Sequence, residues 1–318
     1  MKRPIVPMEP LPHPEPFDHP DFLFQVKWDG IRALAFVIGS DITLQNRKGR
    51  DITRTYVDVA SQPILRPGNS GIVDGELVVL DDTGKPSFPL ILRREQARTE
   101  ATIRRHTEQY PVRFMAFDLL ELNGQALLAY PLHKRLALLQ EYLAVSEQAF
   151  FTDSHLEEGA AFFHGVKALG LEGMVAKEKN SAYVFGKKHG AWKKIKNYRE
   201  ITCPVIGYTQ TQPGRLASLV LGKADDEELT YIGRVSSGLT AKEAELWRQR
   251  LVPLPPEKED RSAPRLKCGL GRKHGPGKPA YTPVFPNHFV HVRYLEWTPD
   301  LCLRHPSYLG AAENSKSP

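Results

Sequence analysis

The chain of 318 residues is poor in cysteine and has no long apolar run. Its three cysteines, Cys203, Cys268 and Cys302, are far apart, and none stands in a Cys-x-x-Cys pair. This spacing predicts free thiols and argues against a disulfide framework or a zinc site. The chain has no stretch of roughly 18 apolar residues, and residues 1–20 lack an apolar secretory segment. We therefore expect no membrane-spanning helix and a protein of the cytoplasm or nucleoid.

The charge balance is basic. Lysine and arginine number 43 against 37 aspartates and glutamates, which gives a net charge of +6 and a pI of about 9.1. This excess favours a polyanionic partner without identifying it. Between residues 177 and 199, eight cations alternate with aromatic residues, a pattern that fits phosphate contacts as well as a solvated face. The hydrophobic share of 41% is sufficient for the cores of two domains.

One lysine directly follows an apolar run. In Phe24-Gln25-Val26-Lys27-Trp28-Asp29-Gly30-Ile31-Arg32, the run predicts a buried strand that ends in a turn. Burial of a lysine as a cation is costly, so Lys27 needs an anion or must lose its proton. Both conditions are met when a lysine attacks a nucleotide phosphate. A surface lysine beside a turn is the plainer alternative.

Acidic residues interrupt a second apolar run, at residues 72–80. The period of a strand puts Asp74 and Glu76 on one face, where they could reach a metal or a ribose hydroxyl together. A buried salt bridge to Arg32 or Arg47 is an equal alternative. Arg47 itself stands in a glycine turn, where it could hold a ribose or phosphate or remain solvated.

Three further features indicate a ligand site. Glu172 begins another apolar run beside a glycine, which permits close approach to the backbone. Period two puts Lys194 and Lys196 on one strand face, where two ammonium groups repel each other unless an anion lies between them. Phe117, in the apolar run 112–120, is either a core aromatic or a wall against which a purine stacks.

The hydrophobic pattern also predicts the domain organisation. We expect helices at 88–98, 132–144 and 156–169, with Arg93 and Arg94 available to a ligand. Beyond residue 199 the chain becomes rich in strands, which fit a five-stranded barrel of about 100 residues with one helix at 240–251. The expected strands are residues 205–208, 218–222, 230–235 and 289–297. The many proline, glycine and basic residues of segment 253–286 predict a long loop, and its basic face could contact nucleic acid.

Taken together, six motifs in the first 200 residues resemble the ordered motifs of the covalent nucleotidyltransferases. They are Lys27-Trp28-Asp29-Gly30-x-Arg32, Asn46-Arg47-Lys48-Gly49, Asp74-Gly75-Glu76, Phe117-Asp118, Glu172-Gly173-Met174-Val175-x-Lys177 and Trp192-x-Lys194-x-Lys196. Within that superfamily the second half looks like the oligonucleotide-binding domain of bacterial ATP-dependent DNA ligases, especially the ligase module of the end-joining type. The segments that carry this likeness are Gly207-Tyr208, Tyr231 to Val235, Val292 to Thr298 and Arg304 to Gly310.

This resemblance implies an α+β fold and a defined activity. Residues 1–199 would form a nucleotidyltransferase domain of the ATP-grasp-like ligase adenylation type, built from antiparallel sheets. Residues 200–318 would form an OB-fold β-barrel. The chain would be an ATP-dependent DNA ligase that seals nicks between a 5′-phosphate and a 3′-hydroxyl through a lysyl-AMP intermediate, in DNA repair. Its cofactors would be ATP and Mg²⁺ or Mn²⁺.

The resemblance also implies roles at the reacting phosphate. Lys27 would attack the α-phosphate of ATP, and Lys194 and Lys196 would neutralise the charge that builds up during transfer. Glu76 would contact the ribose and a metal, and Glu172 would bind Mg²⁺. Residues 197–200 would be a hinge between the two domains.

Further residues would bind the nucleotide, and the partners follow from the activity. Arg32 and Arg47 would hold ribose and phosphate, Phe117 would stack on adenine, and Lys177 would belong to the same site. The expected partners are nicked double-stranded DNA and an end-bridging repair protein that recruits the enzyme. We expect a monomer and no membrane partner.

The sequence departs from the family pattern at three places. Gln25 stands where glutamate is usual, and Leu92 stands where glutamine is usual. After Gly310 the family continues with an arginine and an Asp-Lys pair, whereas this chain has Ala-Ala-Glu-Asn-Ser-Lys. This last departure predicts slow self-adenylation relative to the sealing of DNA that is already adenylated. The competing interpretations are an RNA ligase or capping-type enzyme, a non-catalytic relative, and a plain oligonucleotide-binding protein.

Overall fold

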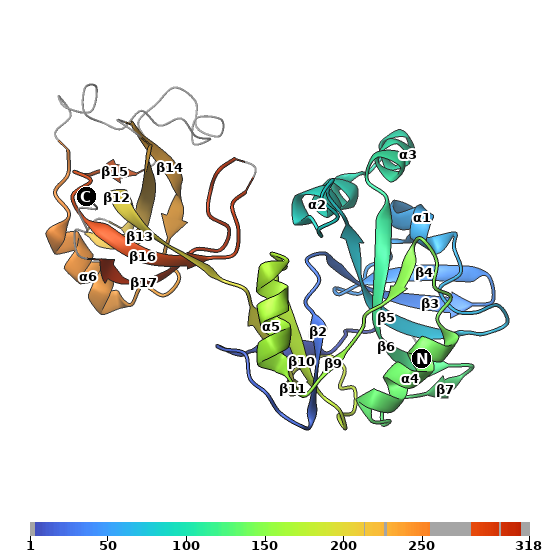
Figure 1. Cartoon of the computed structure of the whole chain (residues 1–318). Coiled ribbons are helices and arrows are strands. Elements are labelled where there is room, and N and C mark those ends of the chain that lie inside the picture. Colours follow the sequence, from blue (N-terminus) through green and yellow to red (C-terminus); the bar gives the residue numbers. More distant parts are fainter. Residues whose placement is uncertain (1–3, 213, 226–227, 255–280, 299, 313–318) are drawn as a thin grey trace. The chain divides into compact units, whose positions relative to one another are not determined.

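The computed structural model describes residues 4–212, 214–225, 228–254, 281–298 and 300–312 (Figure 1). The chain forms two compact units, Met1–Asn197 and Tyr198–Pro318. Most of the loop expected at 253–286, and the end of the altered motif after Gly310, fall outside the described residues. Among the described helices, none is long and apolar enough to cross a membrane.

The first unit contains two β-sheets. One sheet has the strand order β1-β11-β10-β2-β9. The bounds of these strands are Glu9–Pro12, Lys188–Lys196, Gly173–Glu178, Phe22–Val26 and His155–Leu156. The other sheet has the order β4-β3-β5-β6-β7, and β8 pairs with β6. Their bounds are Asp41–Asn46, Ile31–Ile38, Gly71–Val79, Val112–Leu122, Gln125–Ala126 and, for β8, Ala149–Phe151.

Two strand pairs correct the expectation of antiparallel sheets. β1 runs parallel to β11, and β6 runs parallel to β8. Between β6 and β8 the chain passes through helix α4, Leu132–Tyr142, and such a crossover is what a parallel pair requires. β1 and β11 are separated by most of the first unit, so no local pattern fixes their direction.

Helices cover the outer face of each sheet (Figure 1). The expected helices are present as α2, Phe88–Gln96, α4, and α5, Gly159–Ala168. Three short elements were not expected: the 3₁₀ helix η1, Thr53–Tyr56, α1, Val57–Ala60, and α3, Glu100–Gln109. Helices α1, α2 and α4 contribute Val59, Ile91 and Leu139 to a buried core that they share with the β3–β6 sheet. Helix α5 packs through Phe163 against the β2–β10–β11 sheet.

One of the two arginines of α2, Arg94, is not available to a ligand as expected. Arg94 is fully buried and donates to the carboxylate of Asp58 at 2.7 Å and to the carbonyl of Thr55 at 2.9 Å. Arg93 donates to the hydroxyl of Tyr110 at 2.8 Å. The buried guanidinium of Arg94 holds α2 to its neighbours, because a buried charge needs partners that are fixed in the protein. Arg93 is exposed, so its availability to a ligand stays a prediction.

In its described residues, the second unit is an antiparallel sheet with one helix. Its strand order is β14-β13-β12-β16-β17, and β15 pairs with β12. In chain order the bounds are Arg199–Gln212 for β12, Arg215–Asp225, Glu228–Val235, Thr282–Pro283, Phe289–Tyr294 and, for β17, Ser307–Ala312. Helix α6, Ala241–Arg250, begins with a capping box formed by Thr240 and Glu243 and buries Trp247 in the core.

The two ends of this strand order approach each other. The amide of Leu303 donates to the carbonyl of Ile232 in β14 at 2.7 Å, and the amide of Tyr308 in β17 donates to Ser237 at 2.8 Å. Within the residues that the structure describes, β14 and β17 form no ladder with each other. The sheet therefore curls towards a barrel, but a closed barrel is not shown.

Candidate active site

One face of the β2–β10–β11 sheet carries most of the predicted site residues. In β10, Met174 and Ala176 pack with helix α5, so the strand alternation turns Val175 and Lys177 to the other face. Gln25 of β2 and Lys194 of β11 both lie opposite Val175 in register. Trp192 lies opposite Lys177, and Lys196 opposite Gly173. Because residues directly opposite each other share a face, these side chains form one surface.

Lys27 and Glu172 meet at the end of this surface. The Lys27 ammonium donates to Glu172 Oε2, and the Lys196 ammonium lies 3.7 Å from Glu172 Oε1. Gly173 allows β10 and β11 to approach here, since a Cβ at this position would lie 2.2 Å from the carbonyl oxygen of Ile195. One carboxylate, only 9% exposed, therefore balances two ammonium groups.

Lys194 adds a third cation beside this pair. Partial burial lowers the pKa of its ammonium, and the positive charges of Lys196, Lys27 and Lys188 lower it further. The cluster has more positive charge than Glu172 balances, so an anion at this surface would be stabilised.

The β3–β6 sheet contributes an arginine and two carboxylates. Arg32 of β3 forms a bidentate ion pair with Asp74 of β5, with both N–O distances at 2.6 Å. Asp74 is therefore held in the buried salt bridge that was one of the two alternatives for it. Glu76 lies opposite Arg32 in register. Burial raises the pKa of Glu76 to about 8, against the charges of Arg32 and Lys27, which lower it.

Lys177 lies close to two aromatic rings, on the same strand face as Lys194. Its ammonium is 4.1 Å from the ring centroid of Trp192 and 4.4 Å from that of Phe117, and it donates to the carbonyl of Phe117 at 3.2 Å. The guanidinium of Arg32 lies over the Phe117 ring at 4.6 Å. Phe117 is 9% exposed and belongs to the buried core between these residues.

Gln25 belongs to the same face, although the sequence indicated it only as a departure from a family pattern. Its amide nitrogen donates to the carbonyl of Thr152 at 3.1 Å and to the hydroxyl of Ser154 at 3.0 Å. Its buried Oε1 has no hydrogen-bond partner within the described residues. A polar side chain inside the apolar run Phe24-Gln25-Val26 was the available signal, because a buried amide needs partners.

Arg47 stands at the margin of this arrangement. It follows β4, its side chain is 57% exposed, and its guanidinium lies 3.6 Å from the carboxylate of Glu9. Its role at a nucleotide stays a prediction.

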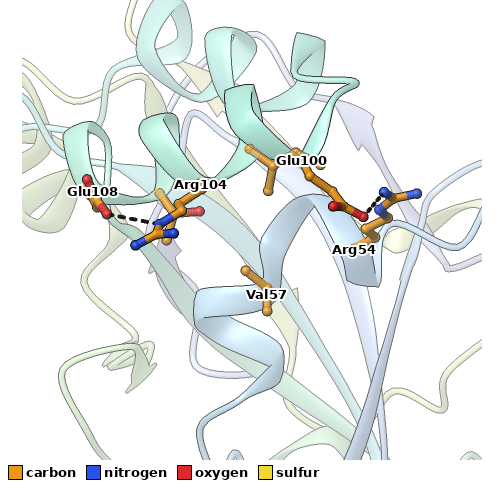
Figure 2. A pocket seen from close by; sticks show the side chains of 7 residues that line it. Arg54, Val57, Glu100, Arg104 and Glu108 are labelled. Carbon is orange, nitrogen blue, oxygen red and sulfur yellow. Dashed lines mark hydrogen bonds and ion pairs between the residues drawn. The ribbon is translucent and has the colours of Figure 1, made fainter.

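The described residues contain no group of three or more His, Cys, Asp or Glu side chains that could hold a metal ion. They do contain a cleft of about 380 Å³ away from this surface (Figure 2). Two ion pairs, Arg54–Glu100 at 2.6 Å and Arg104–Glu108 at 3.7 Å, flank the apolar side chain of Val57 there. The cleft includes none of the predicted site residues.

Comparison with known proteins identifies the chain. The family model described as ATP dependent DNA ligase domain matches residues 14–196, and that of the ATP dependent DNA ligase C terminal region matches residues 212–314. The chain thus belongs to the ATP-dependent DNA ligase family.

Relatives cover nearly all of the chain. It is 32% identical to the multifunctional non-homologous end joining DNA repair protein LigD of Mycobacterium tuberculosis, over 92% of the chain but only 36% of that protein. It is 30% identical to DNA ligase C1 of Mycolicibacterium smegmatis, over 89% of the chain and 86% of the relative. A solved structure of a mycobacterial DNA ligase D complexed with ATP is 26% identical, with a TM-score of 0.55 over 98% of this chain and 95% of that one.

Proposed function

We propose that Lys27 carries AMP during ligation. Its Nζ would attack the α-phosphorus of ATP, forming a P–N bond while the bond to pyrophosphate breaks and the amine loses a proton. The observation that carries this proposal is the position of Lys27 at the end of a surface where Lys194 and Lys196 add positive charge. These two lysines would stabilise the charge that builds up on the phosphate oxygens.

Glu172 would position Lys27 and help to hold a metal. The Lys27 ammonium donates to the Glu172 carboxylate. Two carboxylates, Glu76 and Glu172, fit the oxygen-ligand preference of Mg²⁺ or Mn²⁺, whose other ligands would come from water and nucleotide phosphates. A bound metal would supply charge neutralisation for those phosphates.

Gln25 and Lys177 would select the base. The carbonyl of Thr152 can only accept, so it fixes the Gln25 amide with Nε2 towards it and leaves Oε1 as an acceptor. Lys177 supplies a donor on the same face, beside the ring of Phe117. An acceptor next to a donor complements the exocyclic amine and ring nitrogen of adenine, whereas guanine presents the opposite pattern. Phe117 would stack on the base, and Arg32 and Arg47 would hold ribose and phosphate.

The test follows AMP through the reaction. Wild-type protein and Lys27→Ala are incubated with α-labelled ATP and Mg²⁺, and a nicked DNA duplex is then added. We expect label on the wild type alone, and its release as the nick closes. Lys193→Ala is the matched control, because Lys193 lies on the opposite face of β11, over the rings of Phe17 and Phe22. Label on Lys27→Ala equal to that of the control would refute the proposal.

The domain assignment is also a proposal. We infer that residues 1–199 form the adenylation domain and residues 200–318 an OB-fold domain. The curled antiparallel sheet of the second unit supports this inference, as does the match of residues 212–314 to a ligase C-terminal region. A monomer and a location at the nucleoid fit an enzyme that acts on chromosomal DNA.

We propose nicked double-stranded DNA in end-joining repair as the substrate, with an end-bridging protein as partner. The name of the LigD relative supports this pathway, although the chain spans only about a third of the length of LigD. An RNA ligase is the second candidate. Sealing rates on duplexes with a DNA or an RNA strand at the nick distinguish the two, and faster sealing of RNA would overturn the DNA assignment.

A further inference from the structure

The guanidinium of Arg32 is held by the protein along one edge. It has five N–H groups. Its Nε and Nη2 donate to the two carboxylate oxygens of Asp74, and Nη2 also donates to the carbonyl of Met8 at 3.2 Å. The ring of Phe117 covers one of its faces. Nη1 makes no hydrogen bond within the described residues, so its two N–H groups can bind a ligand.

The hydroxyl of Tyr183 contacts both Asp74 and Met8, the two residues that bind the guanidinium of Arg32. Tyr183 lies between β10 and β11 and is 4% exposed. Its hydroxyl donates to Asp74 Oδ2 at 2.5 Å and accepts from the amide of Met8 at 3.1 Å. One oxygen atom therefore contacts both partners of Arg32, which come from β5 and from the N-terminal segment.

The N-terminal segment is tied to both sheets of the first unit. The backbone of Ile5 exchanges two hydrogen bonds with the side-chain amide of Gln45 in β4, at 3.1 and 2.6 Å. The amide of Gly186 donates to the carbonyl of Val6, and residues 9–12 pair with β11. The Met8 carbonyl is thus fixed in space, and its bond to Arg32 restricts how the guanidinium can turn.

We propose that Tyr183 is a positioning residue for the nucleotide. Its hydroxyl fixes Asp74 and Met8 so that Arg32 presents Nη1 to an oxygen of the ribose or phosphate of ATP. This inference rests on the proposed function, because it concerns how Arg32 meets the same nucleotide. Tyr183 does not itself touch the nucleotide in this arrangement.

The test uses Tyr183→Phe, which removes one oxygen atom and preserves the ring. The rate of protein labelling is measured at increasing concentrations of α-labelled ATP. We expect KM for ATP to rise about tenfold, as when one hydrogen bond to a charged group is weakened. We expect kcat to change less than twofold, since the lost interaction is made equally in the ground state and the transition state.

Tyr56→Phe is the matched control. Tyr56 is fully buried in the same unit, and its hydroxyl donates to the carboxylate of Glu95 at 2.9 Å. Thermal unfolding should show similar losses of stability in both variants, and KM should rise in Tyr183→Phe alone. An equal rise in both would mean that general loosening is responsible and would overturn the inference. If Tyr183→Phe fails to fold, Asp74→Asn must show the same rise in KM.

A double-mutant cycle identifies the route of the effect. Arg32→Lys replaces the guanidinium fork by a single ammonium, so KM should already be raised. Adding Tyr183→Phe to Arg32→Lys should then change KM less than twofold. A further tenfold rise would show that Tyr183 acts independently of Arg32. Absence of label on the wild type would refute the proposed function itself, whereas normal labelling with an unchanged KM in Tyr183→Phe would refute only the positioning role.

Discussion

The buried Lys177 predicts that the stability of the first unit rises with pH. Lys177 is 2% exposed, and its ammonium has the carbonyl of Phe117 as its hydrogen-bond acceptor. Burial dominates and lowers its pKa to about 7. The charges that act on it from neighbouring elements are those of Asp118 and Asp74, which raise the pKa, and Arg32 and Arg135, which lower it.

The sign of the effect follows from proton binding. An unfolded lysine keeps its proton up to about pH 10.4, whereas folded Lys177 releases it near pH 7. Between these values the unfolded state binds more protons, so the free energy of unfolding increases with pH. The slope approaches about 1.4 kcal/mol per pH unit, which gives roughly 2 to 3 kcal/mol between pH 7.5 and 9.5. Below pH 7 both states are protonated and this contribution is constant.

Urea unfolding of the wild type and Lys177→Met at pH 7.5, 8.5 and 9.5 measures this contribution. Trp192 lies against Lys177, so its fluorescence reports on the first unit. The contributions of all other titrating groups cancel when the free energy of unfolding of Lys177→Met is subtracted from that of the wild type. This difference in free energy should increase by about 2 kcal/mol as the pH rises from 7.5 to 9.5. Parallel curves would refute the lowered pKa of Lys177.

Two further predictions concern stability. Arg135→Met leaves the carboxylate of Asp118 buried without its ion-pair partner, as both side chains are fully buried, and should lower the free energy of unfolding by about 3 to 5 kcal/mol. Urea unfolding checks this value, and adding Asp118→Asn should recover part of it. Thr240→Ala removes the capping box of α6 and should cost about 1 kcal/mol, measured through the fluorescence of Trp247; no loss would show that the cap does not stabilise the helix.

The period of a strand was enough to predict which side chains share a face. Lys194 and Lys196 alternate with buried Ile195, and they lie on one face as expected. The sequence also located β12, β13, β14 and β16 of the second unit, although β12 extends well beyond the residues expected for it. It missed β17, and it missed β15, which lies in the segment expected to be a loop. These features depend on local alternation, which the sequence displays directly.

The sequence left the partners of buried charges undecided. Asp74 and Glu76 are two residues apart, yet Asp74 pairs with Arg32, whereas Glu76 forms no such bidentate pair. The hydroxyl of Tyr183, far along the chain, also donates to Asp74. Arg94 was misassigned for the same reason, because its partner Asp58 lies outside the helix that contains it. Tertiary contacts decide such cases, and no spacing rule encodes them.

The lysine cluster predicts opposite effects on stability and activity. Lys194 lies near Lys27, Lys196 and Lys188, so Lys194→Gln relieves repulsion and should raise the free energy of unfolding by a few tenths of a kcal/mol. The same change removes charge stabilisation at the phosphate and should slow labelling by ATP about 100-fold. Lys193→Gln, on the opposite face, loses its contacts with two aromatic rings and should be slightly less stable but label normally. A site that binds an anion has repelling charges when the anion is absent, so removing one charge should stabilise the protein. If Lys194→Gln instead lowered both the free energy of unfolding and the labelling rate, the lysine cluster would stabilise the fold, and this prediction would be refuted.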